Sequence, residues 1–253
     1  MLFRSVGLFQ AIADAMLVVI NWVLWIGPIG VFALAYVVGA RAGSGAFGAL
    51  LHYVLVVTAV GTVVWLAAWP LAWAGARVSP LRFTRAIAPS QAVAFSTQSS
   101  LATLPAMLRA AQKIDVPVAA SGVLLPMAVA IFRATGPAMN LAVAIYVAYW
   151  LDVPLGPAQI ALGIAAAATT TMGAAGIPGQ ATFITSIAPI CLAMGVPIEP
   201  LALLLAVEVL PDLMRTLGNV SMDVAATLTV ARRSGVTETA EPSREDRLLE
   251  EGA

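Results

Sequence analysis

The chain has 253 residues, of which 60% are hydrophobic and 10% are charged, and its mean hydropathy is +0.93. So few polar residues could not cover a water-soluble domain, and the composition predicts a polytopic membrane protein embedded in the lipid bilayer. The formal net charge is zero, which gives no case for nucleic acid as a partner. One cysteine and one histidine argue against a disulfide framework, a zinc site or a serine–histidine triad.

Two long hydrophobic segments come first. Residues 15–38 and 50–74 are both longer than the roughly 20 residues that cross the hydrocarbon core of a bilayer. We expect two spanning helices joined by a loop at residues 41–48. Pro28, with glycines close by on both sides, predicts a kink in the first helix because proline removes a backbone donor.

The next segments are too short to cross a membrane. Residues 83–97 and 101–111 flank a polar patch at residues 96–100. This pattern is typical of a re-entrant helical hairpin whose tip stops at mid-membrane. Residues 124–150 then form one predicted crossing, which is interrupted at its centre by residues 133–137.

A second hairpin is predicted further along the chain. Residues 160–171 and 181–194 flank a glycine-rich stretch at residues 173–179. Two such hairpins, each placed before a longer helix, suggest an inverted repeat with a binding site at its interface. The predicted fold is therefore all-α, with transmembrane helices, two re-entrant helical hairpins and an inverted-repeat core.

The last hydrophobic stretch, residues 200–231, carries five polar side chains at positions i, i+3, i+4, i+7 and i+11. This spacing places all five on one face of a helix. An ionisable group at bilayer depth costs at least ~2.5 kcal/mol unless it is paired or solvated, so the stripe predicts a substrate or ion site. An ion pair between the first two of these residues, Asp212 and Arg215, would not explain the presence of the other three. The five residues are Asp212, Arg215, Thr216, Asn219 and Asp223.

Charged residues outside the spanning segments predict the orientation. Most lysines and arginines fall on one side of a topology with four crossings and two re-entrant hairpins, whereas Arg41, Asp152 and Glu199 fall on the other. By the positive-inside rule, both termini of this multi-pass cell-membrane protein are predicted to be cytoplasmic, including a solvated tail at residues 233–253.

Four motifs occur in order over most of residues 8–232. Asn21-Trp22 and PIGVF at residues 28–32 lie in the first long hydrophobic segment. The first hairpin tip reads SSLATLP at residues 99–105, the second reads GIPG at residues 176–179, and residues 212–223 carry the polar stripe. Together they resemble the dicarboxylate and amino acid:cation symporter family, which includes the glutamate transporters. The resemblance implies scaffold-type helices in residues 1–78, similar to the family's fifth and sixth helices, a transport core in residues 79–232, and a homotrimer.

The resemblance also implies roles for the polar stripe. Arg215 would pair with a distal carboxylate of the substrate and Asp212 with its amino group. Thr216 and Asn219 would bind the remaining polar atoms, and Asn219 with Asp223 would help to coordinate a cation. A guanidinium group suits the first role because it grips a carboxylate with two parallel hydrogen bonds.

The hairpin tips complete the implied substrate site. Ser99 and Ser100 in the first tip, and backbone groups in the second, would add donors for an anion. The second tip is also the expected gate. Its residues are Gly176, Ile177, Pro178 and Gly179.

The chain departs from the family's pattern in two ways. The family's middle-helix motif, Asn-Met-Asp-Gly-Thr, aligns with residues 132–136, which read FRATG, so two oxygen ligands for sodium are missing and sodium coupling is in doubt. We hypothesise that Arg133 stands in for a bound cation as a tethered counter-charge. The alternative is that Arg133 reaches water or pairs structurally with an acid such as Asp223. In addition, the family's first four helices have no counterpart, which would fit a late start codon, a fragment or one half of a split transporter.

These features predict a secondary active symporter, not an enzyme. The expected substrate is a small anionic solute, an acidic amino acid or a C4-dicarboxylate, coupled to sodium or protons without any other cofactor. Asp212 favours a substrate with an amino group, because a buried carboxylate facing a plain dicarboxylate would be costly. One alternative is an inactive or partner-dependent transporter fragment, and another is an anion channel, which would call for rings of similar polar residues along a pore. An intramembrane aspartyl protease does not fit, because eleven residues of helix separate Asp212 from Asp223 by ~16 Å.

Overall fold

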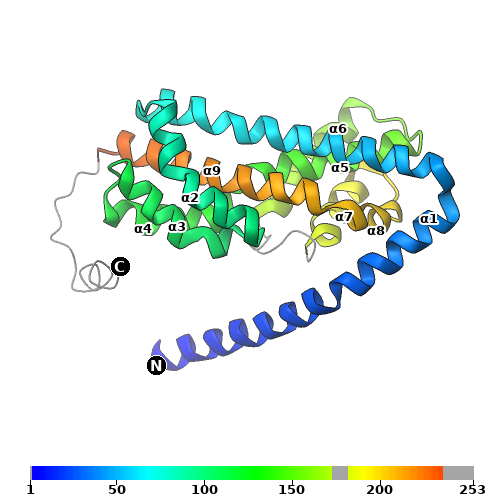
Figure 1. Ribbon diagram of the computed structural model, residues 1–253, viewed down its shortest axis with the longest axis horizontal. Coiled ribbons are helices and arrows are strands. Elements are labelled where there is room, and N and C mark those ends of the chain that lie inside the picture. Colours follow the sequence, from blue (N-terminus) through cyan, green and yellow to red (C-terminus); the bar gives the residue numbers. More distant parts are fainter. Residues whose placement is uncertain (1, 173–181, 236–253) are drawn as a thin grey trace.

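The computed structural model describes residues 2–172 and 182–235, and every regular element in these two ranges is a helix (Figure 1). The elements are α1 (Leu2–Ala76), α2 (Pro80–Thr97), α3 (Ser100–Lys113), α4 (Val118–Met127), the π-helix η1 (Ala128–Phe132), α5 (Thr135–Trp150), α6 (Pro157–Met172), α7 (Phe183–Met194), α8 (Pro200–Leu204), the 3₁₀-helix η3 (Leu205–Val207) and α9 (Val209–Arg233).

Helix α1 is continuous, so the loop expected at residues 41–48 is wrong. Glycines in this stretch lower helix propensity by ~1 kcal/mol each but keep their backbone donors, so the hydrogen-bond ladder can continue. The helix nevertheless changes direction at the right of Figure 1, where its first half leaves the body of the protein and its second half runs along the top.

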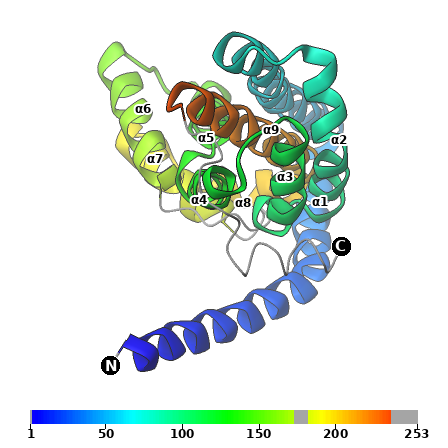
Figure 2. The same ribbon diagram turned by 90° about the vertical axis from the view of Figure 1, so that its left-hand side faces the viewer.

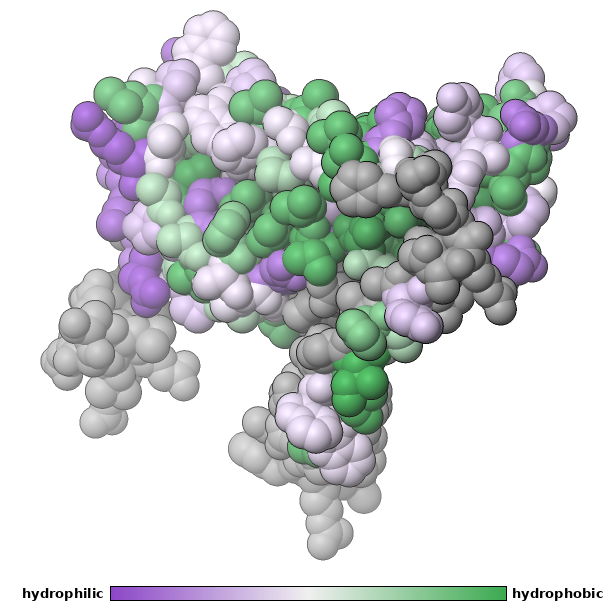
Figure 3. Space-filling model, turned by 45° about the vertical axis from the view of Figure 1, so that its right-hand side comes forward, coloured by the Kyte–Doolittle hydropathy of each residue, from purple (hydrophilic) through white to green (hydrophobic). Residues whose placement is uncertain are grey.

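Two helical segments are long and apolar enough to cross a membrane, Gly48–Ala76 and Val118–Trp150. They confirm the long apolar helices expected at residues 50–74 and 124–150. The second is interrupted where predicted, because η1 ends at Phe132 and α5 begins at Thr135. Hydrophobic residues occupy much of the middle of the face in Figure 3, and strongly hydrophilic ones gather toward its two ends, as expected for a protein that spans a bilayer.

Helices α2 and α3 form the first predicted hairpin. Gln98 takes a left-handed conformation (φ 51°) and Ser99 is extended, so the chain reverses between the two helices. The Ser99 hydroxyl caps α3 by accepting from the backbone N–H of Ala102 at 3.2 Å. In the second hairpin α6 lies against α7, and its expected tip falls outside the described residues. The depth of both hairpins in the membrane, and the inverted repeat, stay predictions.

Helix α9 lies along the second half of α1 (Figures 1 and 2). Glycines permit this close approach. A Cβ added to Gly75 of α1 would overlap the side chain of Thr229, and one added to Gly61 of α1 would lie 3.2 Å from the Cβ of Met214 in α9. Small residues at helix contacts are typical of membrane proteins, where close backbone packing drives association.

Two hydrophobic clusters meet beside α9. One joins the α2–α3 hairpin and α4 to the second half of α9, through residues such as Phe83, Met107 and Val224. The other joins α5, α6, α7 and α8 to α1, through residues such as Met139 and Phe183. The polar first half of α9 adjoins both clusters, and its charged face is buried between them.

The contact between α1 and α9 gives a first testable prediction. Replacing Gly75 with alanine should destabilise the fold by ~1–3 kcal/mol, because the β-branched Thr229 has little freedom to move aside. Gly122, in α4, is the matched control, because nothing lies within 4 Å of its added Cβ. Thermal melting of both variants in detergent compares them, and equal melting temperatures would contradict the close contact.

Candidate functional site

The site begins at a break in the predicted last helix. A single helix over residues 200–231 is wrong, because α8 gives way to η3 and α9 starts only at Val209. Pro211 explains the break: it has no N–H, and its ring crowds the carbonyl four residues earlier. Glu208 lies at this junction and is completely buried.

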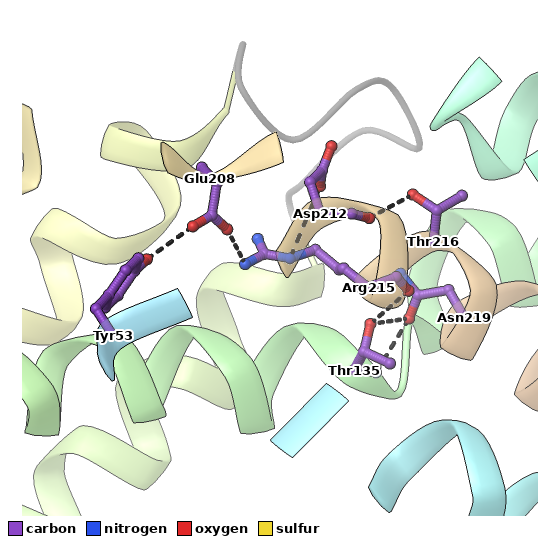
Figure 4. Close-up of polar contacts among 7 residues, drawn as sticks. All are labelled: Tyr53, Thr135, Glu208, Asp212, Arg215, Thr216 and Asn219. Atoms are coloured by element: carbon purple, nitrogen blue, oxygen red, sulfur yellow. Dashed lines mark hydrogen bonds and ion pairs between the residues drawn. The ribbon is translucent and has the colours of Figure 1, made fainter. Parts of the chain in front are cut away.

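Glu208 is the central acid of the site (Figure 4). Its Oε1 lies 2.7 Å from Nη2 of Arg215, and its Oε2 accepts a 2.7 Å hydrogen bond from the Tyr53 hydroxyl. Tyr53 comes from α1, so this contact links the spanning helix to the polar face of α9. Both carboxylate oxygens of Glu208 therefore have partners, as a buried charge requires.

Asp212 is the second acid beside Arg215. Its Oδ1 lies 3.9 Å from Nε of Arg215, an ion pair beyond hydrogen-bond distance. The guanidinium that was expected to bind a substrate carboxylate thus has two protein carboxylates near it, and the closer one was not predicted. The Thr216 hydroxyl donates to the backbone oxygen of Asp212 at 3.1 Å, so it is engaged within its own helix.

Asn219 fastens α9 to the start of α5. Its Oδ1 accepts from the backbone N–H of Thr135 at 3.0 Å and lies 2.7 Å from the Thr135 hydroxyl. The same hydroxyl lies 2.9 Å from the backbone oxygen of Arg215. Thr135 therefore holds the break in the middle crossing against the polar face of α9.

Asp223 and Arg133 complete the charged cluster. Asp223 is completely buried, and within the described residues neither of its carboxylate oxygens has a hydrogen-bond partner. Arg133 lies in the break before α5, with φ 28°, and is 6% exposed. Its charge interacts favourably with Asp212 and Asp223 and unfavourably with Arg215. Its burial argues against the alternative in which this side chain reaches water.

The hairpin tips can be placed only in part. Ser99 and Ser100 are both buried at the start of α3, and the Ser99 hydroxyl caps that helix. The second tip, residues 176–179, lies outside the described part of the chain. Its roles as a binding surface and as a gate stay predictions.

A sodium ion fits poorly between Asn219 and Asp223. Hard cations require several oxygen ligands. The Asn219 side-chain oxygen already accepts from the N–H of Thr135 and lies within bonding distance of its hydroxyl. Phe132 and Ala134, on either side of Arg133, have no side-chain oxygen. Among the side chains described here, the Asp223 carboxylate is what remains to coordinate an ion at this place.

The sequence model of the Sodium:dicarboxylate symporter family matches residues 4–233. The chain belongs to this family. Membership confirms the resemblance read from the hairpin and stripe motifs, and it makes the protein a multi-pass membrane protein of a transporter family rather than of an enzyme family.

Curated relatives of this symporter-family member are neutral amino acid transporters. It is 29% identical to the neutral amino acid transporter B(0) of Mus musculus over 246 residues, which is 96% of this chain and 44% of the relative. It is 30% identical to the Bos taurus B(0) protein (85% of this chain, 40% of the relative) and 27% identical to the Homo sapiens neutral amino acid transporter A (85% and 41%). The chain thus spans less than half the length of these relatives.

Sequence reasoning missed two residues of this site. Glu208 lies four residues before Asp212 and seven before Arg215, so the helical stripe could have been extended back by one turn. Tyr53 gave no comparable signal, because a single hydroxyl in an apolar span has many structural explanations.

Proposed function

We propose that this symporter-family member is a secondary active transporter of a small amino acid that works by alternating access. The observation that carries the proposal is the buried cluster of three acids and two arginines beside a broken crossing and a helical hairpin. Ionisable groups at membrane depth mark substrate or ion pathways, and broken helices are typical of transporter binding sites.

The expected substrate has an amino group and a neutral side chain. The Asp212 carboxylate is the proposed partner of the substrate ammonium, and the buried tip at Ser99 and Ser100 is the proposed partner of its carboxylate. Arg215 is already paired with Glu208 at 2.7 Å, so a second substrate carboxylate would have to share or displace that contact. The printed names of the relatives, which are neutral amino acid transporters, support the same class.

An acidic amino acid or a C4-dicarboxylate is the second candidate. The buried guanidinium of Arg215 favours it, because such a group binds carboxylates strongly where water is excluded.

The proposal has three further parts. Transport is coupled to a cation, sodium or the proton. Residues 176–179 form the gate, and the protein assembles as a homotrimer.

Ligand binding to the detergent-purified chain tests the proposal. Calorimetry with alanine, serine, aspartate and succinate, each in sodium chloride and in choline chloride, separates the candidates. Saturable binding of alanine or serine supports the neutral amino acid. Preferential binding of aspartate or succinate supports the second candidate, and absence of binding by all four in both salts would contradict a substrate site formed by this chain.

A further inference from the structure

Asp223 is a buried acid that receives no positive charge from its own helix. Its carboxylate is completely buried, and neither oxygen is hydrogen-bonded within the described residues. An ionised carboxylate in such surroundings is very unfavourable, so it must be paired with a counter-charge or take up a proton. On α9, Arg215 lies two turns away and is bound to Glu208, and the other arginines are at the far end, at residues 232 and 233.

Arg133 is the cation that the fold brings to Asp223. Thr135, two residues further on, is hydrogen-bonded to Asn219, and Asn219 lies one turn before Asp223 on the same face of α9. The break at Arg133 is therefore fixed beside this part of α9. Its side chain is buried, and its charge interacts favourably with Asp212 as well as with Asp223.

The backbone at Arg133 is strained, which is typical of residues at functional sites. Arg133 has φ 28°, an unusual value for a residue with a side chain. Strained residues persist where the surrounding structure holds them, and they cluster at functional sites. Here the Thr135–Asn219 contacts hold the break, and η1 ends directly before it.

We propose that Arg133 is a tethered cation: its guanidinium neutralises Asp223, so that substrate binding does not require a sodium ion at this place. The guanidinium is part of the protein, so it stays at the site when the site opens to the other side of the membrane. A sodium gradient could then not drive transport through Asp223, because coupling requires that the ion binds there more strongly in one state than in another. Net transport would depend on another ion, such as the proton, or proceed as exchange of one substrate for another.

Two measurements test the inference, and only the second rests on the proposed function. The first measurement is the melting temperature of the ligand-free purified chain in sodium chloride against choline chloride. The second is alanine binding in the same two salts. The wild-type chain should show the same melting temperature and the same affinity in both.

Removing the guanidinium should leave Asp223 without its counter-charge. In the variant Arg133→Met the melting temperature should fall in both salts, and the double variant Arg133→Met/Asp223→Asn should recover it in both, because the side chains at this place do not supply enough oxygen ligands for sodium. Arg133→Lys keeps the charge and should behave like the wild type. Arg109→Met, which removes an exposed arginine, should also leave both measurements independent of sodium.

The outcomes separate the two proposals. If alanine fails to bind in either salt, the proposed substrate is wrong, and the ligand-free melting temperatures still decide the role of Arg133. If the wild type is stabilised by sodium over choline, or if Arg133→Met melts at the wild-type temperature, the tethered-cation proposal is overturned. Should Arg133→Met fail to fold, the double variant Arg133→Met/Asp223→Asn carries the same test, because recovery of the melting temperature is expected only if the two charges neutralise each other.

Discussion

Replacing Asp212 with asparagine should weaken amino acid binding by at least ~100-fold, because the substrate ammonium loses its buried carboxylate. Asparagine has nearly the same shape as aspartate, so the main change is the lost charge. The backbone contacts at this position do not involve the side chain. The Asp212 N–H donates to the backbone oxygen of Glu208 at 2.8 Å, and the backbone oxygen of Asp212 accepts from the Thr216 hydroxyl. Arg215 also keeps its closer partner, Glu208. Calorimetric titration with alanine, together with a melting curve of each protein, measures the effect.

Asp152→Asn is the matched control for this prediction. Asp152 is exposed at the end of α5 and has φ 53°, a conformation that asparagine tolerates well. This variant should bind alanine as the wild type does. If Asp212→Asn binds alanine within about threefold of the wild type, a difference of ~0.7 kcal/mol, Asp212 does not hold the ammonium group.

The polar stripe and the two broken regions could be predicted from the sequence because each depends on local information. Charged residues are rare in apolar segments, so Asp212, Arg215 and Asp223 stand out against their neighbours. The reversal at Ser99 follows from short helices around a run of serine and threonine, which favour helix N-termini over helix interiors. The interruption at Arg133 follows from a charge and a glycine–proline pair inside an otherwise apolar crossing.

The pairing inside the site could not be predicted, because it depends on the break before Pro211 and on one contact between distant segments. Spacing alone suggested Asp212 as the partner of Arg215, yet the break before Pro211 allows Glu208 to approach to 2.7 Å while Asp212 stays at 3.9 Å. The Tyr53 contact joins residues 155 positions apart, and no local pattern contains that information. The continuity of α1 could not be predicted either, because a short stretch between two apolar segments can form a loop or continue the helix, and its local composition does not decide between them.

Glu208 is the closest counter-charge of Arg215, so in the proposed substrate site its replacement should change substrate preference. In Glu208→Gln the side chain keeps its shape and can still bond to Tyr53 and Arg215, but it no longer neutralises the guanidinium. We expect the affinity for aspartate relative to alanine to rise by about 10- to 100-fold, because a ligand carboxylate can then pair with Arg215 without competition from the closer of its two protein carboxylates. Competition of aspartate and alanine against one labelled ligand measures the ratio.

Two further variants separate charge from structure at Glu208. Tyr53→Phe removes the 2.7 Å hydrogen bond to Oε2 but keeps the carboxylate, so it should lower stability and leave the aspartate-to-alanine ratio unchanged. Glu208→Ala leaves Arg215 buried without its closest counter-charge and should destabilise the protein by ~3–5 kcal/mol.

An unchanged aspartate-to-alanine ratio in Glu208→Gln would mean that Arg215 does not meet the substrate side chain. In that case the Tyr53–Glu208–Arg215 chain of contacts serves to hold α1 against α9, and discrimination between neutral and acidic substrates must come from the hairpin tips.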